Sequence, residues 1–115
     1  MKYKVRIIKS AQNDMLEVYR YIANDLQNPT AATNRITLID EKIQSLKENP
    51  SRLPPVRDSY LASKGFRLIL VKSHLIFYII REEIKTVSIM RVLYARRDWA
   101  RILKASDVIN QVDEA

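Results

Sequence analysis

The residues best suited to chemistry stand at the end of the last apolar run, Met90-Arg91-Val92-Leu93-Tyr94-Ala95-Arg96-Arg97-Asp98-Trp99. A strand that ends in this way presents three guanidinium groups and a phenol close together, from Arg91, Tyr94, Arg96 and Arg97. Guanidinium groups bind phosphates and carboxylates through two parallel hydrogen bonds. We therefore expect a compact cationic surface that binds polyanions or acidic protein segments.

The last two residues of this signature have structural interpretations. Asp98 is placed to cap the final helix or to hold an arginine by an ion pair, and not to act as a general base. Trp99 is in helical register with Ile102 and Leu103, which favours packing as an anchor for that helix over stacking on RNA bases. The same two alternatives, core packing and base stacking, are open for Tyr94.

Acid-base chemistry near neutral pH has one obvious source, His74, which is the only histidine. It stands beside Ser73 at a predicted hairpin and has no second histidine or cysteine near it, so a turn residue is the favoured interpretation. Tyr94 and Arg97 are the other candidates for a catalytic role. No group of carboxylates or histidines has the spacing of metal ligands, and we expect neither a metal nor another cofactor.

The composition indicates one soluble domain, residues 1–115, with a basic surface. A chain of this length buries roughly two thirds of its unfolded surface and needs no disulfide or metal to hold its core together. The net charge of +7 is concentrated in the second half. Such a field attracts nucleic acid or acidic protein, although a solvated basic surface explains it equally well. The chain has no cysteine, no signal-peptide pattern and no run of roughly 20 apolar residues, which favours the cytoplasm.

The first half of the sequence predicts a strand followed by two helices. Apolar and charged residues alternate over about 2–9, as in a strand with one apolar face. Ser10 is a plausible N-cap for a helix that should end near Asn28, where Pro29 fits the break. Thr30 can open a second amphipathic helix, and the short link between the two favours an antiparallel hairpin.

The second half predicts three strands and a final helix. Residues 49–63 hold three prolines and fit a long ordered loop, with at most one short turn. Three apolar runs joined by short connections then predict an antiparallel meander, over 66–71, 74–81 and 85–94. The chain becomes helical again from Arg97, and residues 108–115 are expected to fray. The predicted fold class is α+β, with an N-terminal strand and a helical hairpin packed on an antiparallel β-sheet and a C-terminal helix.

With its elements in this order, the chain resembles the RelE/ParE superfamily of toxins from bacterial type II toxin-antitoxin modules. The resemblance covers about Tyr3 to Leu103 and rests on five segments, Tyr19-Arg20-Tyr21-Ile22-Ala23, Ser45-Leu46-Lys47-Glu48-Asn49-Pro50, Phe66-Arg67, Leu75-Ile76-Phe77-Tyr78 and Val92-Leu93-Tyr94-Ala95-Arg96-Arg97-Asp98. It implies an antiparallel sheet with two helices on one face, which agrees with the periodicity. It also implies a protein that arrests growth and is neutralised by a cognate antitoxin.

Two modes of action occur among the proteins that the chain resembles. RelE-like toxins cleave messenger RNA in the ribosomal A site, whereas ParE-like toxins inhibit DNA gyrase. RNA cleavage without a metal needs a base, cations and an acid around one phosphate. Arg67 and Arg97 match basic positions of the RelE-like nucleases, but the positions of two further basic residues and of a tyrosine hold Ile69, Leu75 and Leu103.

The twin Arg96-Arg97 followed by Asp98 and an aromatic residue resembles the ParE-like branch more closely. We therefore expect a gyrase inhibitor that acts by binding. A RelE-like, metal-independent and ribosome-dependent mRNA endoribonuclease is the alternative, because a shared fold does not determine an activity. A non-toxic basic nucleic-acid-binding module is a further alternative, although no groove-reading motif supports it.

The resemblance also implies the partners. The first partner is an acidic antitoxin whose disordered segment folds over the toxin. The target is gyrase or, in the alternative mode, the ribosome with its mRNA. Promoter DNA is contacted only through the antitoxin complex, and no membrane is implied. Arg67 and Arg91 could share one sheet face and outline a cationic groove with Arg96 and Arg97. Arg91 lies within a strand, so it requires either a polar groove or a buried acid as its partner.

Overall fold

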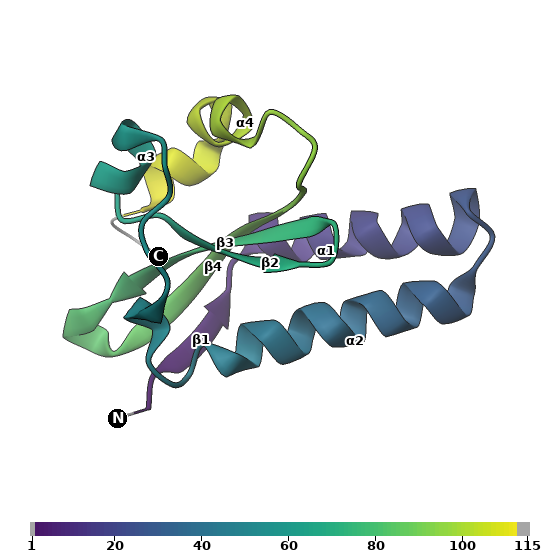
Figure 1. Ribbon diagram of the computed structural model, residues 1–115, viewed down its shortest axis with the longest axis horizontal. Coiled ribbons are helices and arrows are strands. Elements are labelled where there is room, and N and C mark those ends of the chain that lie inside the picture. The colour runs from purple at the N-terminus through teal and green to yellow at the C-terminus, as the bar shows by residue number, and fades with distance from the viewer. Residues whose placement is uncertain (1, 113–115) are drawn as a thin grey trace.

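The fold is built on one mixed sheet of four strands, in the spatial order β1-β4-β3-β2. It is seen in a computed structural model that describes residues 2–112 (Figure 1). The strands are β1 (Lys4–Ile7), β2 (Arg67–Val71), β3 (His74–Arg81) and β4 (Thr86–Tyr94). The predicted α+β class is confirmed, and the three predicted strands of the meander lie within one residue of their observed bounds.

The strand directions follow from the connections. The turns before β3 and before β4 each place a residue in the left-handed region, Lys72 at φ 56° and Lys85 at φ 47°, and they join β2, β3 and β4 into the predicted antiparallel meander. The pairing of β1 with β4 is parallel, with Lys4 opposite Thr86. Periodicity did not specify this direction; it arises because the helical hairpin separates β1 from the meander and returns the chain to the far side of the sheet.

The helical hairpin consists of α1 (Lys9–Arg20), a π-helical turn (Tyr21–Asp25) and α2 (Pro29–Ser45). The predicted cap at Ser10 is wrong, because α1 begins earlier, at Lys9, and no side chain caps it. The two helices break just before Pro29, as predicted, but the second one begins at Pro29 itself and not at Thr30. Asn28 caps α2 through its side chain, which accepts a hydrogen bond from the Ala31 N–H at 3.1 Å, and Pro29 is the first helical residue, where its missing N–H costs nothing.

Two short helices, α3 (Ser59–Ser63) and α4 (Trp99–Ala105), cover the opposite side of the sheet from α1 and α2 (Figure 1). The segment predicted as a loop therefore contains α3 and also a 3-10 turn, Pro50–Arg52. The side chain of Asp58 starts α3 by accepting from the Leu61 N–H at 3.0 Å. None of the helices within residues 2–112 has the length and apolar character needed to cross a membrane.

The sheet separates two apolar cores, and β3 contributes to both. Phe77 faces α3 and α4, where its ring lies 5.3 Å from that of Trp99. Tyr78 faces α1 and α2, and its hydroxyl donates to the Pro50 carbonyl at 2.7 Å. In the described part of the tail, Val108 is fully buried in the first core and residues 107–111 form a 3-10 helix; fraying from Val108 stays a prediction. Residues 113–115 lie outside the described residues.

Candidate functional site

A concave surface that combines aromatic with polar side chains lies between the hairpin tip and the ends of β3 and β4. Two adjoining cavities, of about 490 and about 360 Å³, share Tyr21, His74 and Tyr94 as lining residues. We call them together the His74 groove. The first cavity is completed by Ile22, Leu26, Ala31, Arg35 and Ser73, and the second by Asp14, Glu17, Val18, Val92, Leu93 and Arg97. The three residues weighed for catalysis, His74, Tyr94 and Arg97, therefore come together here.

His74 is the first residue of β3 and is buried, with 8% of its surface exposed. Its Nδ1 lies 3.1 Å from Nη1 of Arg35 on α2. A guanidinium group only donates, so Nδ1 accepts and the neutral ring carries its proton on Nε2. Burial, and secondarily the charge of Arg35, lower the pKa of His74 below its ordinary value. The ring of Tyr94 meets it edge-on at 5.8 Å. At neutral pH His74 is thus a hydrogen-bond donor toward its surroundings and not a free base.

This arrangement predicts a pH dependence of stability. Because the folded pKa of His74 lies below the unfolded value of about 6.5, the unfolded chain binds more protons in this range, and stability falls as pH drops through 6.5. The substitution His74→Gln keeps an acceptor for Arg35 but removes the titration. We expect the variant to lose less unfolding free energy than the wild type between about pH 8 and about pH 5.5 in urea denaturation. Equal losses in both proteins would contradict a buried neutral histidine.

Arg91 has a largely buried acid as its partner, which is close to one of the two arrangements expected for it. Its Nε lies 2.6 Å from Oδ2 of Asp14 on α1, and its Nη2 lies 2.9 Å from Oδ1. The same carboxylate accepts the Val92 N–H at 2.9 Å, where β4 extends past the end of β1, and Nη1 donates to Ser106 at 3.2 Å. Arg91 therefore joins α1, β4 and the segment after α4, and its charge is already neutralised.

Arg67 lies elsewhere. Its guanidinium donates to the Leu53 carbonyl. The strand register places Arg67 opposite Tyr78 and Arg91 opposite Phe77, whose side chains face different cores. The expectation that Arg67 and Arg91 share one sheet face is therefore wrong, and the four arginines do not outline one groove.

The turn after β4 presents the remaining residues of the signature. Arg96 and Arg97 are exposed, and of the two only Arg97 lines the His74 groove. Asp98 occupies the N-cap of α4, where its carboxylate accepts from the Arg101 N–H at 3.5 Å. Trp99 is half-buried against Phe77. These positions give Asp98 and Trp99 structural roles, and they leave Arg97 and Tyr94 available to a partner.

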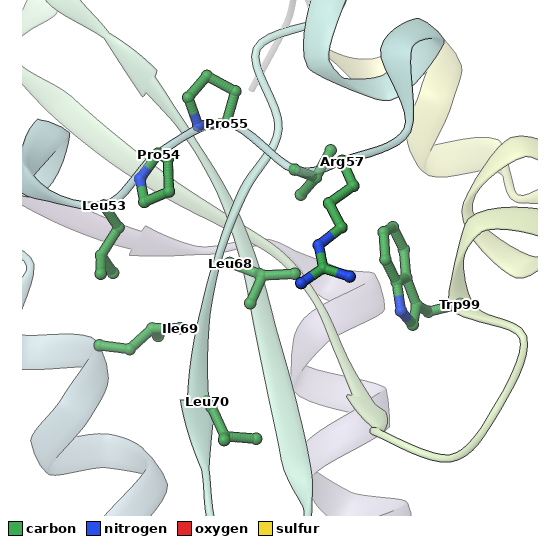
Figure 2. Close-up of a pocket in the computed structure, with 9 residues that line it drawn as sticks. Leu53, Pro54, Pro55, Arg57, Leu68, Ile69, Leu70 and Trp99 are labelled. Atoms are coloured by element: carbon green, nitrogen blue, oxygen red, sulfur yellow. The ribbon is translucent and has the colours of Figure 1, made fainter.

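A second groove, of about 500 Å³, follows the outer edge of β2 (Figure 2). Arg57 is the only charged residue among its lining side chains, which include Leu53, Pro54, Leu68, Leu70 and Trp99. The Phe66 carbonyl accepts the Val56 N–H on this edge, where Pro55 forms an antiparallel bridge with Arg67. The backbone groups of Leu70 point the same way, and beyond that bridge no strand within residues 2–112 pairs with this edge. With 58% of Leu70 exposed as well, this edge is suited to a protein segment and not to catalysis.

Three residues of the structure were not singled out as site residues by the sequence. Arg35 appears there only as one charge on the polar face of a helix, Tyr21 as part of a family-like segment, and Asp14 as a carboxylate near a helix start. Asp14 and Arg91 are 77 positions apart, and Arg35 and His74 are 39 apart. No local pattern connects residues so distant. Within residues 2–112, no three His, Asp or Glu side chains converge as metal ligands.

Comparison with known proteins gives a family model and several solved structures. The model described as the ParE toxin of the type II toxin-antitoxin system, parDE, matches residues 5–99. A chromosomal ParDE toxin-antitoxin system from P. aeruginosa is similar with a TM-score of 0.67 and 15% identity, over 83% of this chain and 98% of that one. No curated protein sequence matches.

Two further structures have the same fold. The toxin-antitoxin complex RelBE2 from Mycobacterium tuberculosis gives a TM-score of 0.58 and 23% identity, over 82% of this chain and 92% of that one. A mutant of the E. coli toxin RelE in the free state gives 0.56 and 17%, over 99% and 97%. At these identities the likeness concerns the fold.

Proposed function

The chain belongs to the ParE toxin family of type II toxin-antitoxin systems, and from that premise we propose that it arrests bacterial growth by binding and inhibiting DNA gyrase. The superfamily resemblance found in the sequence is confirmed. The observation that carries the proposed mode of action is the match of a ParE model, specifically, over residues 5–99. The protein acts in the cytoplasm in this proposal.

The chemistry of the described residues supports a binding mode. A metal-free nuclease needs a base, an acid and several free cations at one phosphate. Nδ1 of His74 already accepts from Arg35, Arg91 is paired with Asp14, and Arg67 lies apart from both. The exposed Arg96 and Arg97 remain for contact with a target, and a binding inhibitor needs no more than a complementary surface.

One observation favours the second candidate, a RelE-like ribosome-dependent mRNA endoribonuclease. His74, Tyr94 and Arg97 line the same groove, so a donor, a phenol and a cation stand near each other. In that mode Tyr94 would be the acid or base in place of the tyrosine missing near Leu103.

The partner in either mode is an acidic antitoxin, and the solved structures that this chain resembles include toxin-antitoxin complexes. We propose that a disordered antitoxin segment becomes ordered along the open edge of β2. There it can pair with main-chain groups of the strand and pack on the exposed Leu70. Promoter DNA is then contacted only by the assembled complex.

The test is pulse labelling of DNA and protein synthesis in bacteria within minutes of inducing the chain, with the antitoxin from the adjacent gene as the rescue. We expect DNA synthesis to fall first, with DNA-damage signalling, and the antitoxin to relieve the arrest. The double variant Arg96→Ala with Arg97→Ala should fold normally and arrest growth less. Early loss of translation with cleaved messages would support the nuclease instead, and harmless accumulation of folded protein would contradict any toxin.

A further inference from the structure

Arg35 is a half-buried cation that has no acidic partner within residues 2–112. Its Nη1 donates to Ser73 Oγ at 3.3 Å and to His74 Nδ1 at 3.1 Å, and both of these acceptors are neutral. The ion pairs among residues 2–112 do not include Arg35, although they include Arg91 with Asp14 and Arg81 with Glu83. Its Nε and Nη2 have no acceptor in the described part of the chain. Partial burial of an uncompensated charge is costly, so this site is suited to receive an anion.

The space in front of Arg35 is apolar and aromatic. In the cavity of about 490 Å³, Arg35 is the only charged lining residue, and Tyr21, Leu26 and Tyr94 form an exposed rim. The remaining polar groups, on Ser73 and His74, are held against Arg35 itself. A ligand for this cavity therefore combines one negative group with bulky apolar groups.

We propose that the Arg35 cavity receives a segment of the antitoxin in which an aspartate or glutamate carboxylate pairs with Arg35 and a neighbouring large apolar side chain fills the space beside Tyr21 and Leu26. The inference rests on the proposed function, because it takes the antitoxin as the partner. Nε and Nη2 of Arg35 form one edge of a guanidinium group, and that edge matches the two oxygens of a carboxylate.

The electrostatics favour a carboxylate over a nucleic acid. The two carboxylates of the adjoining cavity, Asp14 and Glu17, are each paired with an arginine, so the preference rests on the Arg35 cavity itself. A phosphate backbone carries one charge per nucleotide, whereas this cavity offers one cation among apolar and aromatic side chains, which suits a single acidic side chain with apolar neighbours. The net charge of +7 attracts nucleic acid and acidic protein alike, so the lining of the cavity, and not the net charge, carries this preference.

The first test measures the dissociation constant of the antitoxin from the adjacent gene for the full-length variant Arg35→Gln, by titration calorimetry. Loss of one partner of a desolvated charge pair is expected to raise the constant roughly 30-fold or more. The matched control is Arg20→Gln, an exposed arginine on the same hairpin, which should change it less than about threefold. An unchanged constant for a folded Arg35→Gln protein would overturn the inference.

Growth separates this inference from the proposed function. If the chain is a toxin, the wild type arrests growth, and Arg35→Gln should arrest it too but escape neutralisation by the co-expressed antitoxin. If the antitoxin still fully relieves the arrest caused by Arg35→Gln, the proposed role of Arg35 is refuted and the proposed function is not. If the wild type causes no arrest, the proposed toxin function itself is refuted.

A second measurement avoids the variant, in case Arg35→Gln fails to fold. Addition of the antitoxin to the wild-type chain should shift the imidazole resonances of His74, the only histidine, because its partner Arg35 gains a carboxylate. Resonances that do not move on complex formation would overturn the inference. A shift produced by a single-stranded RNA, and not by the antitoxin, would also overturn it and would indicate a nucleic-acid site.

Discussion

The substitution Asp14→Ala is expected to lower the free energy of unfolding by about 3–5 kcal/mol, because it leaves the guanidinium of Arg91 without a counter-ion in a largely buried position. It also removes the acceptor of the Val92 N–H at the unpaired end of β4. Urea denaturation followed by circular dichroism measures the change.

Two matched variants interpret that result. Glu17→Ala, one turn further along α1 and exposed, should change stability by less than about 0.5 kcal/mol. The double variant Asp14→Leu with Arg91→Met replaces the ion pair by an apolar pair and should recover much of the loss. If Asp14→Ala costs no more than Glu17→Ala, the pair does not hold α1 to β4.

The substitution Phe77→Ala should cost about 3–5 kcal/mol, since it empties the space of a fully buried ring in the core under α3 and α4. It should also loosen α4, whose first residue, Trp99, packs on Phe77. Trp99 is the only tryptophan, so a red shift of its fluorescence at low denaturant reports this loosening directly.

The control for Phe77→Ala is Leu70→Ala on the neighbouring strand. Leu70 is exposed at the edge of β2, so its truncation should change stability by less than about 0.5 kcal/mol and leave the fluorescence of Trp99 unchanged. A mild effect of Phe77→Ala, with unchanged fluorescence, would mean that α4 is held by other contacts.

The partners of Arg91 and Arg35 separate these two arginines by task. Arg91 is used for the fold, because Asp14 compensates its charge within the chain. Arg35 is the opposite case, since its acceptors are neutral and it lines a largely apolar cavity. Counting basic residues in the sequence treats both alike, and only their partners distinguish a structural arginine from one available for binding.

The secondary structure was predictable because it depends on neighbours in the chain. The apolar run in 74–81 reads as a strand covered on both faces, and β3 contributes to both cores. The short connections predicted the antiparallel meander for the same reason. The helix boundaries were less predictable. Serine and asparagine are both good N-cap residues, yet Ser10 lies inside α1, which begins at Lys9 just after β1, whereas Asn28 caps α2.

The sequence by itself therefore determined the class of fold, the order of its elements and the resemblance to toxins, all of which follow from local periodicity and short motifs. Only the tertiary structure decided that β1 is parallel to β4, that Arg67 and Arg91 face different cores, and that Asp14 neutralises Arg91. The contact between Arg35 and His74 was likewise decided by the tertiary structure. The physical reason is that these polar contacts join residues 39 and 77 positions apart in the sequence. A local pattern carries no information about which distant side chains the packed helices and sheet bring together.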